Sequence, residues 1–149
     1  MKKIFAVMAV LCGLALTSCH NEPTNQPKVS FGFTIDELGS DYVGITAEPS
    51  DSQAFYCFEV ATVHFADSIG SNSELAAEDI RYIEGMIEYL HERGYDYDFV
   101  DFVYQGISTE EWGGLSPSTD HVAYAFCVDT ATHTLIGDVY KVPFRTLDE

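Results

Sequence analysis

The sequence predicts a mostly β protein, an antiparallel sandwich of about seven strands with one α-helix packed on a sheet. Several segments alternate apolar and polar residues, or are rich in β-branched and aromatic residues, as strands are. Turn-forming residues separate these segments, and they follow one another without the strand–helix alternation that builds a parallel sheet. One long segment has the 3.6-residue periodicity of an amphipathic helix.

Three strands are predicted before the helix. Residues 29–38 and 41–51 alternate apolar and polar side chains and end in turn-forming residues, Gly39-Ser40 and Pro49-Ser50-Asp51. Residues 54–63 carry large apolar side chains at both odd and even positions, so both faces of this strand are expected to be covered. It should be a central strand.

The helix is predicted over residues 71–94. Ser71 and Glu74 fit a capping box at its start, and Gly94 fits the left-handed residue that ends many helices. The apolar stripe consists of Ala76, Ile80, Ile83, Ile87 and Leu90, widened by Tyr82, Met86 and Tyr89. We expect these aromatic side chains to pack in the core and not to form a platform for sugars.

The remaining strands are predicted near residues 102–107, after a turn of helix, and at 121–129 and 135–146. Side chains alternate between the two faces of a strand. If His121, Ala123, Ala125 and Cys127 point inward, the residues between them form a second apolar row on the outer face. That row is Val122, Tyr124, Phe126 and Val128. An exposed apolar row of this size is unusual, so we expect the helix to cover it.

A short motif precedes residue 121. Leu115, Pro117, Thr119 and His121 resemble the LxPxTxY signature of fibronectin type III-like domains, with His121 in place of the corner tyrosine. The resemblance implies an immunoglobulin-like or fibronectin type III-like sandwich over about residues 29–146. In this layout the helix is an insertion in a connection, near residues 64–104, that is longer than the family's usual one.

Cys57 and Cys127 are the cysteines of the predicted folded domain. An oxidising compartment would permit a disulfide between them, and the resemblance makes their strands neighbours. Strand alternation, however, sends Cys127 inward and Cys57 outward if Tyr56 and Phe58 are the inward pair. A disulfide and two buried free thiols both remain open.

The first 18 residues are predicted to be a signal peptide. Lys2 and Lys3 precede an apolar run, residues 4–17, that is shorter than the roughly 20 residues a membrane span needs. Residues 16–19, Leu-Thr-Ser-Cys, resemble the lipobox of bacterial lipoproteins. Residues 19–28 then form a polar, proline-containing tether, and residues 29–149 form the domain.

The lipoprotein resemblance implies that Cys19 carries a diacylglycerol thioether, with acyl chains such as palmitate, and becomes the new N-terminus. Two or three acyl chains give a lasting anchor. His20 is not the aspartate associated with retention in the inner membrane of Gram-negative bacteria, so the outer membrane is expected. Whether the protein faces the periplasm or the cell surface stays open.

The chain is strongly acidic, with a formal charge of -17. Removing residues 1–18 takes away two of the seven Lys and Arg residues and none of the 24 Asp and Glu residues, which gives -19. Nucleic acid is therefore excluded as a partner, because it needs a basic surface. The acidic surface is either simply solvated or attracts a basic partner or divalent cations.

The sequence carries no catalytic motif such as HExxH or GxSxG, so we expect no enzyme and no cofactor. Asp96, Asp98 and Asp101 alternate with aromatic residues but lack the glycine and glutamate of a calcium loop, so no metal site is predicted. These acids and Trp112 are the candidate ligand contacts. Trp112 is either a contact residue or a plug for one end of the sandwich.

These observations predict a non-catalytic binding or interaction module, anchored to the membrane by its N-terminal lipid. Its partner would be an envelope protein or a glycan. The alternative is an accessory subunit of an envelope system for polysaccharide uptake, adhesion or protease inhibition, where small lipoproteins of this kind occur.

Overall fold

The computed structural model describes residues 28–149. The predicted signal peptide (1–18), the predicted lipid attachment site Cys19 and nearly all of the predicted tether lie outside the described residues. Among the described residues, no helix is long and apolar enough to cross a bilayer.

Seven strands and three helical segments make up the described chain. The strands are β1 (Phe31–Leu38), β2 (Tyr42–Pro49), β3 (Phe55–Thr62), β4 (Tyr104–Gln105), β5 (Ser108–Gly113), β6 (Asp120–Asp129) and β7 (Thr134–Arg145). The helices are α1 (Val63–Ser68), α2 (Asn72–His91) and the 3-10 helix η1 (Phe99–Phe102).

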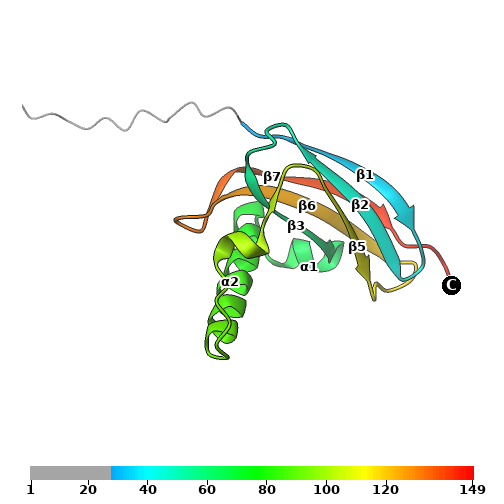
Figure 1. Ribbon diagram of the computed structural model, residues 1–149. Helices are drawn as coiled ribbons and strands as arrows, with labels where there is room; N and C mark the ends of the chain where they lie inside the picture. The colour runs from blue at the N-terminus through cyan, green and yellow to red at the C-terminus, as the bar shows by residue number, and fades with distance from the viewer. Residues whose placement is uncertain (1–27) are drawn as a thin grey trace, which may run out of the picture.

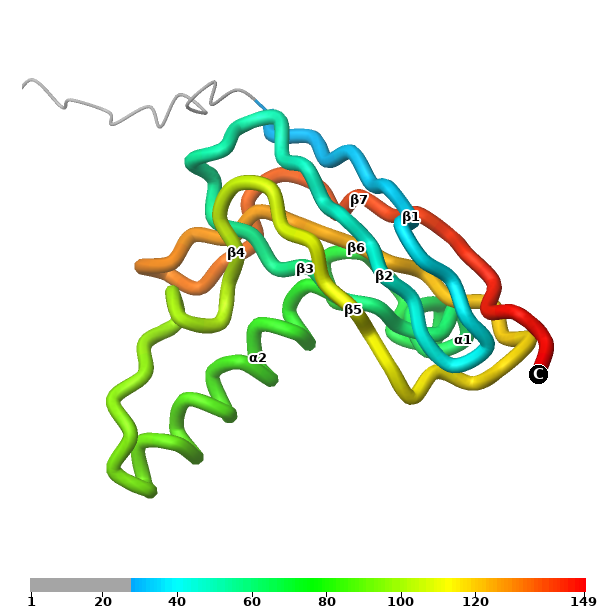
Figure 2. Tube along the Cα trace, turned by 45° about the vertical axis from the view of Figure 1, so that its right-hand side comes forward, coloured from blue at the N-terminus to red at the C-terminus, as the bar shows by residue number. Residues whose placement is uncertain are grey.

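The strands form two antiparallel sheets, which confirms the predicted sandwich (Figure 1). One sheet has the order β1-β2-β5 and the other has the order β4-β3-β6-β7. The fourth strand joins the sheet of the third, whereas an immunoglobulin constant-type domain pairs the fourth strand with the fifth. All three helical segments lie in the connection between β3 and β4, and α2 extends beneath the sheets (Figures 1 and 2).

The space between the sheets is filled by the side chains that point inward from both. Val43 and Ile45 of β2 pack with Tyr56 and Phe58 of β3, and all four are buried. The small inward residues of β6, Ala123 among them, leave room for these rings. This is the inward row of β6 that the sequence predicted.

A second core lies on the outer face of the β4-β3-β6-β7 sheet. The outer row of β6 is buried there: Val122, Tyr124, Phe126 and Val128. The residues of α2 that bury it are Leu75, Ala76, Ile80 and Ile83. The helix therefore covers the sheet as predicted, because its apolar stripe matches the exposed row of the strand.

Both predicted ends of α2 are confirmed to within a few residues. The Ser71 hydroxyl accepts a hydrogen bond from the Glu74 backbone N–H at 3.2 Å and donates one to the Glu74 carboxylate at 2.8 Å. At the other end Gly94 has φ +82°, a left-handed conformation that glycine adopts at low cost.

Three elements differ from the sequence predictions. Residues 102–107 form only the two-residue strand β4, preceded by η1. The polar strand β5 and the short helix α1 were not predicted. Strand β5 (STEEWG) has one large apolar residue, Trp112, so hydrophobic alternation cannot reveal it, and its place is set by pairing with β2.

His121 is buried near the start of β6 and is held by contacts on both sides. Its ring is 2% exposed and stacks on Phe144 at 5.3 Å between centroids. The Nδ1–H donates to the Thr119 carbonyl oxygen at 2.9 Å, and the Thr146 hydroxyl donates to the Ser116 carbonyl at 2.7 Å. The imidazole therefore bonds back to the backbone two residues upstream.

Cys57 and Cys127 are buried free thiols in the structure. Cys57 is paired in register with Phe126 and belongs to the core under α2. Cys127 is paired with Tyr56 and belongs to the core between the sheets. The two sulfurs therefore lie on opposite faces of one sheet, where no disulfide forms between them.

Ile83→Asp should destabilise the domain by about 3 kcal/mol or more, because it places a charge where a buried apolar side chain now packs. Ala77→Asp is the matched control, since Ala77 is exposed on the same helix. The control should cost less than about 1 kcal/mol, which is mainly helix propensity. The free energy of unfolding, measured in urea, decides; equal losses for the two variants would mean that α2 does not pack through Ile83.

Candidate functional site

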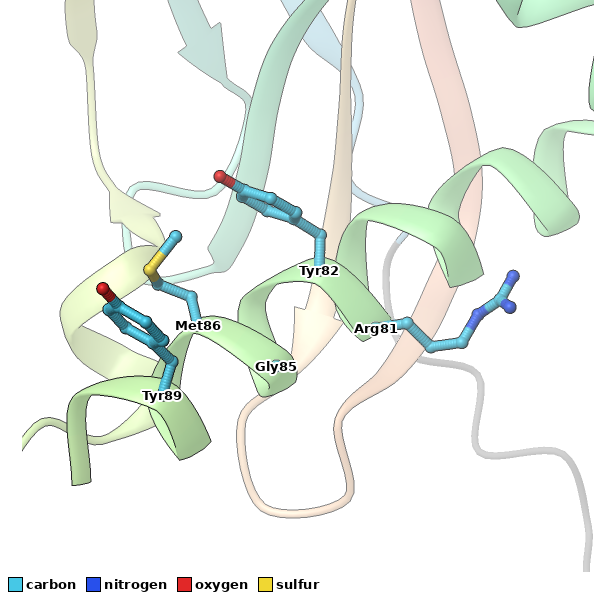
Figure 3. A pocket seen from close by; sticks show the side chains of 5 residues that line it. All are labelled: Arg81, Tyr82, Gly85, Met86 and Tyr89. Atoms are coloured by element: carbon cyan, nitrogen blue, oxygen red, sulfur yellow. The ribbon is translucent and has the colours of Figure 1, made fainter. Parts of the chain in front are cut away.

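Helix α2 carries three large side chains on a face that the sheet does not cover. Tyr82 is 70% exposed and Tyr89 is 50% exposed, with the partly exposed Met86 between them. The spacing i, i+4, i+7 places the three on one side of the helix. Figure 3 shows their side chains pointing the same way. We call Tyr82, Met86 and Tyr89 the tyrosine face.

An open hollow of about 470 Å³ lies over the tyrosine face (Figure 3). Besides the three residues of the face, Arg81 and Gly85 line it. A Cβ atom built on Gly85 would meet nothing within 4 Å. The glycine is therefore not required by packing within the described chain, although glycine in a helix costs about 1 kcal/mol relative to alanine.

The tyrosine face corrects the expectation that the tyrosines of α2 pack in the core. Ile80 and Ile83 occupy the side of the helix that rests on the sheet. Successive helix residues are about 100° apart, so Tyr82 and Tyr89 point to one flank of that contact. An apolar stripe this wide exceeds what one flat sheet can cover.

Two acidic side chains lie where α2 meets the sheet: Asp79 on α2 is partly buried, and Glu59 on β3 is exposed. A hydrogen bond from Tyr124 on β6 lowers the pKa of Asp79, and the charge of Asp79 raises the pKa of Glu59. Glu59 and Tyr124 are paired in register across the two strands. Among the described residues, the buried Oδ2 atom of Asp79 has no hydrogen-bond partner. We call Glu59 and Asp79 the carboxylate pair.

The carboxylate pair is electrostatically unfavourable when both groups are charged. Burial, followed by the charge of Asp79, raises the pKa of Glu59 to about 7, against a smaller opposing contact from Trp112. Burial also raises the pKa of Asp79 to about 6; Tyr124 opposes this and the Glu78 charge adds to it. Glu59 still has part of its surface in solvent, so water screens some of this repulsion.

No positive charge compensates the pair within residues 28–149. Lys28, Arg81 and Arg145 form salt bridges elsewhere, with Asp138, Glu78 and Asp120 respectively. Arg93 lies over the Tyr89 ring, 3.5 Å from its centroid. Lys141 on β7 pairs in register with Tyr124, and β7 flanks β6 on the side opposite to β3. Its charge does not contribute to the pKa shift of Glu59 or of Asp79.

The structure does not bring the predicted contact residues together. Trp112 lies within β5 and not in a loop; it is half-buried and packs edge-on against Phe58, 4.7 Å between ring centroids. The Asp98 backbone N–H donates to the Asp101 carboxylate at 2.8 Å, so these acids cap η1. Asp96 is exposed in the turn after α2. Among the described residues, no three His, Cys, Asp or Glu side chains are grouped to hold a metal ion.

Sequence reasoning missed the carboxylate pair, although a signal for it existed. Glu59 is the one charged residue in the run of residues 54–63, where both faces were expected to be covered. Asp79 stands directly before Ile80, on the side of the helix that carries the apolar stripe. A charged residue at each of two expected core positions indicates a shared polar contact.

Asp79→Asn should flatten the pH dependence of stability. A carboxyl whose folded pKa lies above its unfolded pKa disfavours folding increasingly as pH rises between the two values, here from about 4 to about 6. The wild type should therefore lose roughly 1–2 kcal/mol relative to Asp79→Asn between pH 4 and pH 7. Urea unfolding at several pH values measures this, with Asp96→Asn at an exposed site as the control. Parallel curves for wild type and Asp79→Asn would contradict the expectation.

Comparison of the sequence with known proteins gave no matching family model and no matching curated relative.

Proposed function

We propose that the mature protein is a lipid-anchored, non-catalytic binding module of the outer membrane that binds an envelope protein through the tyrosine face of α2. The observation that carries this proposal is the exposure of Tyr82 and Tyr89 on a well-capped helix. Tyrosine is enriched at protein interfaces, because it offers a large rigid surface with a polar tip. Two such rings on one side of a helix form a ready contact surface.

The spacing of the face supports a protein partner. Side chains at i, i+4 and i+7 are the anchors by which an amphipathic helix lies in an apolar groove. Met86, between the two tyrosines, is a flexible and polarizable side chain that adapts to such a groove. A sugar would also need several side chains that hydrogen-bond its hydroxyl groups, whereas two rings around a flexible thioether suit an apolar protein groove, so a glycan is the less well supported partner.

Gly85 supports close approach to the helix. It lies between Tyr82 and Met86 and leaves the backbone uncovered within the hollow. Glycine in an interface lets another chain come near the helix axis, as small residues do where helices pack closely. Gly85 lowers the stability of the helix, and no contact within the described chain requires a glycine there. A residue that costs stability without a packing reason is typical of a functional position.

Gly85→Leu should block the partner and leave the fold intact, since a side chain there would fill open space. A photo-crosslinking residue at position 82 identifies the partner in whole cells, with position 77 on another side of the helix as the control. The affinity of the purified partner is then measured for wild type, Gly85→Leu and Ala77→Leu. We expect a loss of more than tenfold for Gly85→Leu alone, because overfilling a packed contact costs about 1.4 kcal/mol or more.

Equal affinity for the two leucine variants would overturn the proposal that this face is the contact. A crosslink at position 77 and none at position 82 would do the same. Binding of a purified glycan that depends on Tyr82, without any protein crosslink, would replace the envelope protein with a glycan partner.

The lipid anchor has its own test at Cys19. Cys19→Ala should release the protein from the membrane or leave its signal peptide uncleaved, because the acyl chains supply the membrane affinity. Metabolic labelling with a fatty-acid analogue, followed by detergent phase partition, measures this. Wild-type protein that takes up no label and stays in the aqueous phase would disprove the anchor.

Envelope systems for polysaccharide uptake, adhesion and protease inhibition use small lipoproteins of this kind, and a role as an accessory subunit of one of them is the second candidate function. It differs from the first in requiring a lasting complex. Co-purification of the crosslinked partner at fixed stoichiometry through size-exclusion chromatography would favour it.

A further inference from the structure

The tyrosine face belongs to a longer stripe of side chains whose spacing is the same from either end. The members of this stripe are Glu78, Tyr82, Gly85, Met86, Tyr89 and Arg93. Met86 is partly exposed and the other five are exposed. Successive members are four, three, one, three and four residues apart, so they follow one side of the helix and the centre lies between positions 85 and 86. We call this set the palindromic stripe.

Arg93 is part of the stripe although it follows the last residue of α2. Its guanidinium carbon lies 3.5 Å from the centroid of the Tyr89 ring, and its Nη1 donates a hydrogen bond to the Tyr89 carbonyl oxygen at 3.1 Å. None of the salt bridges within residues 28–149 involves Arg93. The stripe therefore has a negative charge at one end, Glu78, and at the other end a positive charge that no described carboxylate neutralises.

We infer that the partner of the tyrosine face is a second copy of this chain, with the two α2 helices antiparallel and a two-fold axis at the centre of the palindromic stripe. This inference rests on the proposed function and names its partner. Each residue then meets the residue that lies equally far from the centre in the other copy, as in the isologous interfaces of most dimers. The C-terminal half of α2 projects beyond the sheets, so each helix can lie along the N-terminal half of the other (Figure 2).

The middle of the stripe is self-complementary in shape. Two-fold symmetry sets Tyr82 of each copy beside Tyr89 of the other, which gives two aromatic pairs. It also sets Gly85 of each copy opposite Met86 of the other, so that a small residue faces a long, flexible one. Met86 of the second copy would thus enter the hollow of about 470 Å³ that surrounds Gly85.

The charges at the ends of the stripe select the antiparallel order. Glu78 of each copy lies beside Arg93 of the other, whereas a parallel pair of helices would set Glu78 against Glu78 and Arg93 against Arg93. Glu78 already forms an exposed salt bridge with Arg81 in its own chain. A carboxylate has two oxygen atoms, however, and can accept hydrogen bonds from a second cation.

The net charge of the chain opposes association and limits the strength of the dimer. Two chains that each carry a formal charge of -17 or below repel each other. Salt at physiological concentration screens charges more than about 8 Å apart, so the distant acids are weakened more than the contact pairs. The dimer should be weak in dilute solution. The proposed lipid anchor would favour it, because two copies confined to one membrane have a high effective concentration.

The test reverses the charges at the two ends of the stripe. It uses the mature chain, residues 19–149, with Cys19→Ser so that it stays in solution. Sedimentation equilibrium measures the dimer dissociation constant of the wild type, of Glu78→Lys and of Arg93→Glu. Each variant alone should dimerise about tenfold or more weakly than the wild type, because symmetry turns two attractive pairs into two repulsive ones. Asp41→Lys is the control: it makes the same change of charge as Glu78→Lys at an exposed turn outside α2.

An equimolar mixture of Glu78→Lys and Arg93→Glu should recover an affinity close to that of the wild type. In the mixed dimer the introduced lysine faces the introduced glutamate, and Glu78 of one copy faces Arg93 of the other. Both substitutions are at exposed positions, so each variant should keep its fold, which circular dichroism checks. Weakened single variants and recovery in the mixture together support the inference.

Three results would overturn the inference. The first is a wild type that sediments as a monomer at every concentration up to about 1 mM, where even a weak complex would form. The second is a dimer that Glu78→Lys weakens no more than Asp41→Lys does. The third is a mixture of the two charge variants that associates no better than either variant alone.

Crosslinking in whole cells separates this inference from the proposed function. A product at position 82 that contains only this chain supports both. A product that contains a different protein, without a self-crosslink, overturns the inference and leaves the proposed function standing. If no protein crosslinks at position 82, the proposed function fails, and sedimentation alone decides whether the helices associate.

Discussion

The burial of β6 on both faces is the constraint on which the rest of the structure depends. Residues 121–128 are all buried, and β6 pairs with β3 on one side and with β7 on the other. Its inward row completes the core between the sheets, whereas its outward row needs α2. A sandwich with this strand and without the inserted helix would expose an apolar face, so the insertion is part of the fold and not an addition to it.

The position of α2 in turn creates the surface proposed for binding. A helix on a flat sheet buries one side, and the apolar residues of α2 extend beyond that side. The flank that carries Tyr82 and Tyr89 stays exposed beside this contact. One stripe of α2 packs on the sheet, and the adjoining stripe forms the proposed binding surface. The position of that surface therefore depends on the stability of the second core.

Sequence patterns predicted the fold better than the site. The 3.6-residue period of α2 and the two apolar rows of β6 were sufficient to predict that the helix covers the sheet, because both follow from burial alone. Strand β5 escaped prediction because its polar residues are held by pairing with β2. Glu59 and Asp79 meet only through the contact between α2 and the sheet, a tertiary arrangement that periodicity within one segment does not encode. The acids that did form a visible pattern, Asp98 and Asp101, cap a local turn.

The separation of the two thiols has a consequence for how the domain matures. Cys57 and Cys127 lie in different cores, each 3% exposed, and burial raises the pKa of both. Neither is a ready thiolate, so oxidants and thiol exchange partners find little to react with once the chain has folded. Residues 28–149 can thus reach their native state without forming a disulfide, and they keep it when the surrounding redox conditions change.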